Sequence, residues 1–155
     1  MSKSYAMTGY RVGFTRANPD YIELAAKLQE PFVSCGTGFS QLASAEALDG
    51  RQEPVTAMRE AYHRRRDIAV EVLRAYDLYR YTPGGAIYLM IDISASGMNS
   101  HDFAMKLLNK KRVAVAPGKT FGKMCEDHIR ISIAASDEHI RRGVTAICEL
   151  VREGQ

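Results

Sequence analysis

The sequence HIRISIA at positions 128–134 alternates apolar and polar side chains more strictly than any other segment of the chain. Successive side chains of a β-strand point to opposite faces, so the three isoleucines share one face and Arg130 lies on the other. The pattern predicts a strand with one buried face. On this pattern alone Arg130 faces either solvent or a cleft, and solvent is the commoner environment.

The segments on either side of this strand predict alternating helices and strands. Apolar residues recur at three- and four-residue steps after Pro54, which indicates an amphipathic helix of about six turns. Apolar content predicts a strand over 86–93 and a short one over 113–116. Residue 99 or 100 should cap a helix between them, and Ser136 should open the last helix. Together these elements predict a compact α/β layer of about 100 residues.

Residues 1–50 differ from this layer. Residues 1–16 show no helical period, and Asn18-Pro19 then signals a helix that should end near Pro31. A second, alanine-rich helix should close near Asp49-Gly50. Because both helices are short and have no sheet of their own, this part of the chain is interpreted as the edge of another domain.

The composition is that of an ordinary globular protein. The chain has 155 residues, a formal net charge of +3, 46% hydrophobic residues and 25% charged residues. Its longest purely apolar stretch, 86–91, is far shorter than the roughly 20 residues of a membrane-spanning helix. No apolar run follows Lys3, and the three cysteines have unrelated spacings. We therefore expect no membrane span, no secretory signal and no disulfide framework, and the cytoplasm is the expected compartment.

The sequence favours neither a nucleic-acid site nor a metal site. The basic run 63–66 has the acidic residues Glu60, Asp67 and Glu71 within a turn, so a solvated helix face is expected rather than a nucleic-acid site. Nucleic-acid binding through this run stays a weaker alternative. The spacing Cys125-x-x-His128 supplies half of a metal site but no second pair follows, so no metal is expected.

A fixed pattern of residue types occupies positions 2–13. It consists of a small residue, a lysine, two variable positions, a small and an apolar residue, and then glycine, arginine, an apolar residue and glycine at set offsets. The residues that fill it are Ser2, Lys3, Ala6, Met7, Gly9, Arg11, Val12 and Gly13. This segment resembles the cofactor-lysine signature of the class I and II aminotransferases, which are pyridoxal-phosphate enzymes of the aspartate aminotransferase fold.

The far end of the chain supports the same resemblance. Residues 113–122 and 128–134 are similar to the family's strand-turn segment and its carboxylate-binding arginine strand, and 83–88 is similar to the start of the family's small domain. The resemblance implies an α/β fold, the C-terminal part of a pyridoxal-phosphate-dependent transferase beginning at the cofactor lysine. In that fold residues 1–50 end the large cofactor-binding domain, 51–78 form a long inter-domain helix, and 79–155 form the small C-terminal α/β domain.

The resemblance also implies roles for three cationic residues. Lys3 would be the catalytic lysine that holds pyridoxal 5'-phosphate, Arg11 would contact the cofactor phosphate, and Arg130 would bind the substrate α-carboxylate. A planar guanidinium suits both anions. Eight extended residues would cover up to about 26 Å, so the chain must turn back between Lys3 and Arg11 for both to reach one cofactor. Without the motif, Lys3 would be interpreted as a frayed terminus and Arg11 as a surface arginine.

The activity implied by the resemblance is the transfer of an amino group between an amino acid and a 2-oxo acid, by a homodimer. The isolated chain is expected to be inactive, because family members carry most of the cofactor pocket ahead of the lysine. The alternative is a non-enzymatic small-domain module that binds a protein partner, which exposed apolar patches would mark. Tyr5, Tyr10 and Tyr88 could line a site by their positions, although aromatic residues are more often part of a core.

Overall fold

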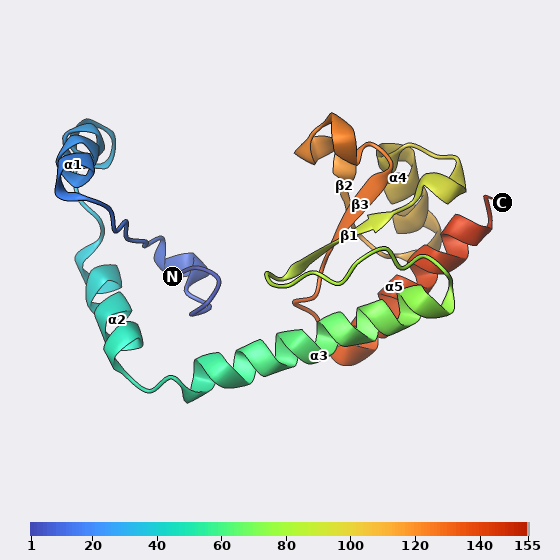
Figure 1. Cartoon of the computed structure of the whole chain (residues 1–155), viewed down its shortest axis with the longest axis horizontal. Coiled ribbons are helices and arrows are strands. Elements are labelled where there is room, and N and C mark those ends of the chain that lie inside the picture. The colour runs from blue at the N-terminus through green and yellow to red at the C-terminus, as the bar shows by residue number, and fades with distance from the viewer. Residues whose placement is uncertain (155) are drawn as a thin grey trace. The chain divides into compact units, whose positions relative to one another are not determined.

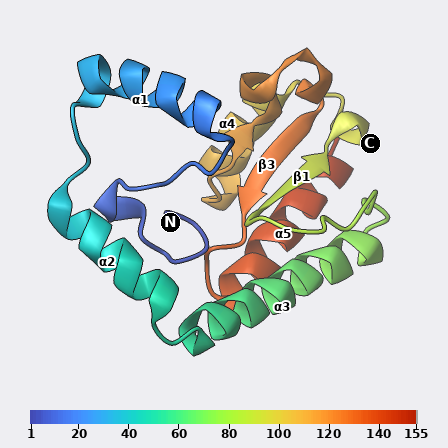
Figure 2. The same cartoon turned by 60° about the vertical axis from the view of Figure 1, so that its left-hand side comes forward.

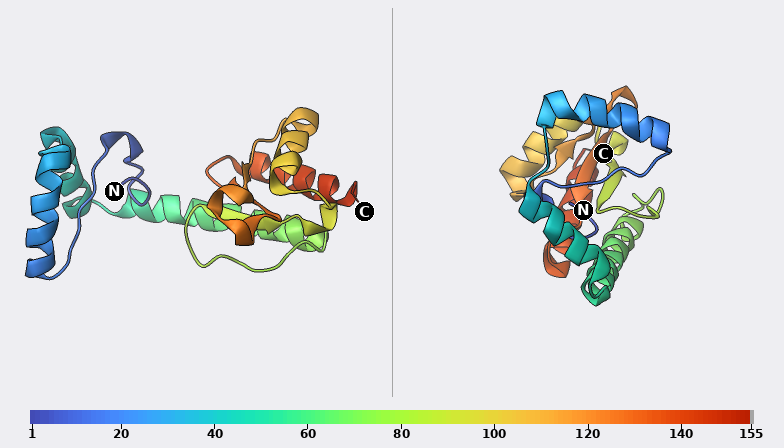
Figure 3. Two further views of the ribbon diagram at one scale, coloured as in Figure 1. Left: turned by 90° about the horizontal axis from the view of Figure 1, so that it is seen from above. Right: turned by 90° about the vertical axis from the view of Figure 1, so that its left-hand side faces the viewer.

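The computed structural model describes residues 1–154, which fall into two compact units. The first unit is Met1–Met58, and the second begins at Arg59. The boundary lies inside helix α3 (Glu53–Ala75), which is continuous along its length (Figure 1; Figure 3, left). This is the long helix that the apolar spacing after Pro54 predicts.

The second unit is built on an antiparallel sheet with the strand order β1-β3-β2. Its strands are β1 (Tyr88–Asp92), β2 (Ala116–Pro117) and β3 (His128–Ser132). The predicted strand at 128–134 is therefore confirmed, and it occupies the centre of the sheet. Arg130 pairs in register with Met90 on one side and Ala116 on the other. Pairing on both sides gives Arg130 a rigid backbone position.

One face of this sheet packs into the hydrophobic core. Ile129, Ile131 and Ile133 are buried, as their alternation predicts. They share the core with side chains of β1, α3, α4 (Ser100–Lys111) and α5 (Asp137–Arg152). Figure 2 shows these elements around β3. The main apolar partners are Leu89, Ile91, Phe103, Leu107, Val144 and Ile147. The unit thus has the predicted α/β core, with Arg130 on the opposite, partly exposed face.

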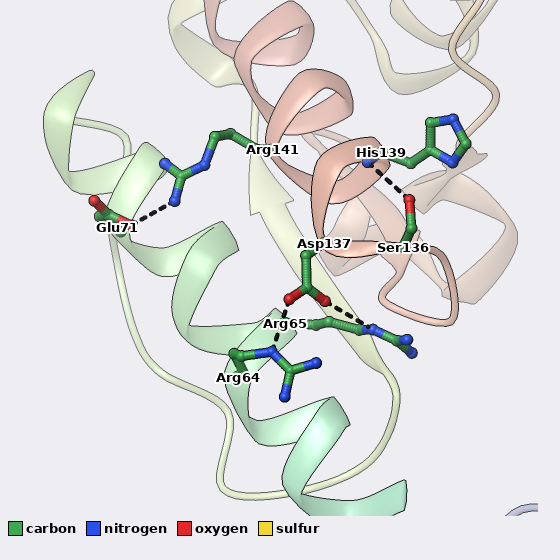
Figure 4. Close-up of polar contacts among 7 residues, drawn as sticks. All are labelled: Arg64, Arg65, Glu71, Ser136, Asp137, His139 and Arg141. Carbon is green, nitrogen blue, oxygen red and sulfur yellow. Dashed lines mark hydrogen bonds and ion pairs between the residues drawn. The ribbon is translucent and has the colours of Figure 1, made fainter.

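Side chains cap the helices at the positions that the sequence indicates. Asn99 Oδ1 accepts hydrogen bonds from the N–H groups of His101 and Asp102 at 3.1 and 3.0 Å. Ser136 Oγ accepts one from the N–H of His139 at 3.2 Å (Figure 4). Such a cap stabilises a helix by about 1 kcal/mol, because it satisfies N–H groups that have no partner inside the helix.

Two predicted strand boundaries are wrong. β1 begins at Tyr88 because Ala86 has a positive φ of 67°, which takes the chain out of the extended conformation. β2 is Ala116–Pro117 rather than 113–116, because these are the residues that pair with β3. Pro117 does not break this strand, since β2 lies at the edge of the sheet, where proline is tolerated.

The first unit consists of helices and a curled N-terminal loop. Its elements are the short 3₁₀ helix η1 (Thr8–Tyr10), α1 (Pro19–Val33) and α2 (Gly38–Asp49). The predicted end of α1 at Pro31 is wrong, because this proline removes only one N–H group from the last turn. The helix continues to Val33, and the N–H of Ser34 donates to the carbonyl of Glu30 at 2.9 Å.

This unit has almost no apolar core. Met7 is the one buried apolar side chain within residues 1–58, and α1 buries no residue at all. Leu24, Leu28 and Phe32 follow one another at four-residue steps along α1, and Phe32 is 83% exposed. Residues four apart share a face of a helix, so these three form one exposed apolar stripe. We call them the α1 stripe.

Candidate functional site

The loop that carries Lys3 is closed by hydrogen bonds. The N–H of Tyr5 donates to the carbonyl of Met1 at 3.2 Å, and Thr8 Oγ1 donates to the carbonyl of Ser2 at 2.9 Å. The second bond brings residue 8 back to the residue next to Lys3. The Lys3 amine has no hydrogen bond or ion pair within residues 1–154, and the residue is exposed. A free amine is therefore presented on a curled loop.

Arg11 belongs to the same loop. It follows η1 with a positive φ of 50°, a conformation that turns its side chain back along the loop. Its Nη1 donates to the carbonyl of Thr8 at 3.0 Å. Thr8 thus bonds to Ser2 through its side chain and to Arg11 through its carbonyl, which links the segment around Lys3 to the Arg11 guanidinium. The remaining guanidinium N–H groups form no ion pair within the described chain, so they are available to an anion.

Arg11 also lines a hollow of the first unit with a volume of about 540 Å³. The lining residues come from the N-terminal loop and from α1 and α2, and they include Val12, Phe14, Val33 and Leu48. The hollow is therefore mainly apolar with one guanidinium at its edge. Lys3 is not among the residues that line this hollow. Lys3 and Arg11 belong to the same curled loop, and an amine and a guanidinium are the groups that suit the aldehyde and the phosphate dianion of pyridoxal phosphate.

Arg130 lies in the second unit, between two aromatic rings. Its Cζ is 4.2 Å from the centre of the Tyr88 ring and 4.1 Å from the centre of the Phe121 ring. Both distances are well inside the limit of about 6 Å for a cation–π interaction. The guanidinium makes no hydrogen bond and no ion pair within residues 1–154. Its edge is thus free on the face of the sheet opposite the core.

The loop between β2 and β3 supports Phe121. Gly118 begins the 3₁₀ helix η3 (Gly118–Phe121), and a Cβ at this position would collide with the carbonyl oxygens of Cys125 and His128. Glycine is therefore required for the loop to lie this close to the start of β3. Thr120 Oγ1 also donates to the carbonyl of Pro117 at 2.7 Å, which tightens the same turn.

The sequence named Tyr88 as a residue that could line a site, with a core position as the commoner alternative, and it did not single out Phe121. Tyr88 is only partly buried, because it alternates with Leu89 and faces the side of the sheet that carries Arg130. Its place was readable from that alternation. Phe121 reaches Arg130 only through the fold of its loop. The sequence signal for a tight turn in this loop is the pair of glycines Gly118 and Gly122.

Tyr5 and Tyr10, the other two tyrosines that the sequence named as possible site residues, lie in the first unit. Tyr5 Oη donates to Gln52 Oε1 at 3.2 Å. The Tyr10 ring packs edge-on against Phe39 at a centroid distance of 6.5 Å. Neither contact involves Lys3 or Arg11, so these rings have no assigned part in the site.

The basic run on α3 forms ion pairs within the protein. Asp67 pairs with Arg66 at 2.6 Å, as the spacing predicts. Arg64 and Arg65 differ from the expectation, because both bind Asp137 at the start of α5, at 2.7 and 3.3 Å (Figure 4). These arginines therefore join two helices of the second unit.

The described residues provide neither a metal-binding cluster nor a membrane-spanning helix. Among residues 1–154, no group of three or more histidine, cysteine, aspartate or glutamate side chains is placed to hold a metal ion. Within the same residues, no helix is both long enough and apolar enough to cross a membrane.

Comparison with known proteins gives one consistent family. The model of aminotransferase class I and II matches residues 1–147. A putative aminotransferase, YugH, of Bacillus subtilis is 38% identical over 143 residues, which are 92% of this chain and 37% of that protein. An aspartate aminotransferase of Pyrococcus horikoshii is 38% identical over 157 residues, covering 99% of this chain and 40% of that protein.

The solved structures agree with the sequence relatives. The crystal structure of an aromatic aminotransferase from Pyrococcus horikoshii superposes with a TM-score of 0.90 and 36% identity, covering 98% of this chain and 41% of that one. An aminotransferase from Mycobacterium tuberculosis gives a TM-score of 0.88 at 28% identity, over 98% of this chain and 40% of that one. The chain therefore spans about two fifths of the length of these relatives. By its sequence match and its fold, the chain belongs to the class I and II aminotransferase family.

Proposed function

We propose that this chain is the C-terminal portion of a pyridoxal-phosphate-dependent aminotransferase that transfers an amino group between an amino acid and a 2-oxo acid. The observation that carries the proposal is the hydrogen-bonded loop that links the segment around Lys3 to the Arg11 guanidinium through Thr8. The relatives that bear the name aminotransferase over nearly the whole length of this chain support it.

In this proposal Lys3 and Arg11 hold pyridoxal 5'-phosphate, the amine at its aldehyde and the guanidinium at its phosphate. When bound, the cofactor supplies an electron sink for the negative charge that develops at the substrate α-carbon. The Lys3 amine must be uncharged to act. It would then take the proton from the substrate α-carbon and deliver it to the cofactor carbon that had carried the aldehyde. A lysine on a short loop suits this task, because the same amine first holds the cofactor and then moves the proton beside it.

Arg130 binds the α-carboxylate of the substrate. Amino acid and 2-oxo acid share this carboxylate, so one guanidinium serves both halves of the reaction. Because Arg130 lies on the central strand β3, the bound carboxylate has a fixed position, which restricts the orientation of the α-carbon bonded to it. Neither half of the reaction needs a second anion site for this group.

The proposal extends to the arrangement of the whole protein, and the family match supports it. Residues 1–50 end a large cofactor-binding domain, 51–78 form an inter-domain helix, and 79–155 form a small α/β domain. The continuous α3 supports the second assignment. A homodimer in the cytoplasm is part of the same proposal. The isolated chain is expected not to transfer amino groups, because relatives devote three fifths of their length to other segments.

The second candidate is a module that binds a protein partner and performs no chemistry. The α1 stripe supports it, because Leu24, Leu28 and Phe32 are exposed at 62%, 64% and 83%. A contiguous exposed apolar surface is one mark of a site of protein–protein contact. In an aminotransferase the same surface would pack against the rest of the protein.

Chemical labelling separates them. The full chain is incubated with pyridoxal phosphate, reduced with borohydride, and digested so that modified lysines can be located by mass spectrometry. We expect Lys3 to be labelled more strongly than Lys27, which is held in an ion pair with Glu23 at 2.6 Å. Arg11→Met should lower the label at Lys3, since it removes the phosphate contact. Lys27→Arg is the matched control and should leave the label at Lys3 unchanged.

An even distribution of label over the lysines, unaffected by Arg11→Met, would favour the partner-binding module. It would mean that Lys3 reacts only as an exposed amine. The proposal that this loop keeps a cofactor site would then be withdrawn.

A further inference from the structure

The two rings around Arg130 form an arrangement that no other arginine of residues 1–154 has. Arg65, Arg74 and Arg152 each lie over a single tyrosine ring, at 5.6, 4.5 and 4.4 Å. Arg130 lies over two rings, those of Tyr88 and Phe121, and its distance to each ring centre is shorter than in the three single pairs. We call this arrangement the Arg130 sandwich.

A sandwich of this kind restricts how the guanidinium meets a ligand. Because its central carbon lies over both rings, the guanidinium has two sides occupied by aromatic carbon, and a ligand is left with the N–H groups at its edge. A carboxylate binds that edge with two parallel hydrogen bonds in one plane. A small spherical anion has no such geometry to match. The sandwich therefore favours a planar carboxylate over a spherical anion of the same charge.

The rings also keep the guanidinium from moving. An arginine side chain that is free in solution adopts many rotamers, and a ligand must order it on binding. Stacking between two rings orders it beforehand, so less affinity is lost when the carboxylate arrives. The backbone of Arg130 is already held from both sides by the sheet. The rings extend this order from the backbone to the end of the side chain.

Packing of the core does not explain Phe121. This ring is 44% exposed and is absent from the hydrophobic core cluster. The tight turn at Gly118 nevertheless directs the loop back toward β3, where the ring meets Arg130. An exposed ring on a loop built in this way is better accounted for by its contact with the cation than by burial.

We propose that Tyr88 and Phe121 are positioning residues, which hold the Arg130 guanidinium so that only its edge can receive the substrate carboxylate. The inference rests on the proposed function, in which Arg130 binds that carboxylate. It adds that selectivity for a planar carboxylate comes from the rings rather than from Arg130 alone.

The test observes Arg130 directly in the full chain. Arginine is labelled with ¹⁵N, and the Nε–Hε resonance of Arg130, assigned with Arg130→Lys, is followed by NMR as sodium propionate or sodium chloride is added. We expect propionate to shift this resonance saturably and chloride to shift it less. Phe121→Leu and Tyr88→Leu should each weaken propionate binding about threefold, the cost of ordering one flexible side chain. Both should also reduce the preference for propionate over chloride.

Two variants serve as controls. Phe121→Tyr keeps a ring at this place and should retain the affinity and the preference. Tyr79→Leu removes the ring over Arg74 in the same unit and should leave the Arg130 response unchanged. If Tyr88→Leu disturbs β1, the exposed Phe121 carries the test, because its replacement removes no core contact.

Two results would overturn the inference in different ways. If Phe121→Leu binds both anions as the unaltered chain does, the rings do not position Arg130, and its role as the carboxylate site stands. If propionate leaves the Arg130 resonance of the unaltered chain unmoved, the inference fails together with the carboxylate role assigned under the proposed function.

Discussion

At the scale of single residues, the site depends on side chains whose surroundings are set by neighbours far away in sequence. Arg130 lies on β3, Tyr88 lies on β1, and Phe121 lies in the loop before β3. The alternation of 128–134 was enough to predict that Arg130 faces away from the core. It could not predict the two rings, because their contact with Arg130 arises from the sheet register and the loop fold.

Gly118 is the residue on which this loop depends most. We expect Gly118→Ala to destabilise the protein by about 1–3 kcal/mol, because the new methyl group would collide with the carbonyl oxygens of Cys125 and His128. Urea unfolding followed by circular dichroism measures the change in the free energy of unfolding. Gly84→Ala is the matched control, since no atom lies within 4 Å of the place where its Cβ would be.

A free energy of unfolding for Gly118→Ala equal to that of Gly84→Ala would show that the loop can move away from β3 at no cost. The placement of Phe121 would then lose its structural reason.

At the scale of elements, the sequence predicts local features well and pairings across the chain poorly. The last helix and its Ser136 cap are found where the sequence places them, since a cap depends on residues one turn apart. The partner of Arg64 and Arg65 was missed, because Asp137 is more than 70 residues away along the chain. Only the packing of α3 against α5 brings these charges together.

The Asp137 carboxylate makes the contact between α3 and α5 depend on pH. Its hydrogen bond with Arg64 lowers the pKa of Asp137 below the ordinary value; desolvation opposes this, while Arg65 adds to it. A carboxylate with a lowered pKa in the folded state stabilises that state above the ordinary value of about 3.9, and the stabilisation is lost as the pH falls through the lowered pKa. The contribution is therefore present near neutral pH and disappears in acid.

Asp137→Asn should accordingly lower the free energy of unfolding at about pH 6 and have progressively less effect toward about pH 2.5. Urea unfolding of both proteins across this range measures the difference. Glu138→Gln removes one negative charge from the same helical turn without touching α3, and serves as the control. A difference between Asp137→Asn and the unaltered chain that stays constant with pH would contradict the assignment.

A second ion pair joins these helices with the charges reversed, the arginine on α5 and the acid on α3, and the sequence did not predict it for the same reason. Arg141 Nη2 of α5 lies 3.0 Å from Glu71 Oε2 of α3, and both side chains are more than half exposed (Figure 4). Exposed pairs of this kind contribute little to stability. Their main effect is to fix which faces of α3 and α5 meet.

At the scale of the whole molecule, the two units differ in how much of their apolar surface is buried. The second unit has a core built from its sheet and helices, whereas the first buries one apolar side chain within residues 1–58. The sequence indicated this contrast, because the helices before residue 50 are short, rich in alanine and without strands.

The α1 stripe should therefore bind apolar dyes and promote association. Replacing Leu24, Leu28 and Phe32 together by glutamate is expected to reduce the fluorescence of the bound dye and to lower the average sedimentation coefficient. Exposed apolar area favours both dye binding and self-association, and the substitutions remove it. Met105→Glu with Leu108→Glu, on α4, is the control, as these side chains are exposed at only 44% and 40%. Equal effects of the two sets of substitutions would show that the stripe has no special role.

The central proposal is that Lys3 and Arg11 hold the cofactor of an aminotransferase and that Arg130 binds the carboxylate of its substrate. A chimera tests it most directly: residues 1–147 of this chain replace the matching segment of the Bacillus subtilis relative, and transfer of an amino group from an amino acid to a 2-oxo acid is measured with added pyridoxal phosphate. The account predicts transfer by the chimera, loss of at least about 100-fold with Lys3→Ala, and a raised KM for both substrates with Arg130→Leu. A folded chimera whose rate is unchanged by Lys3→Ala would contradict the account.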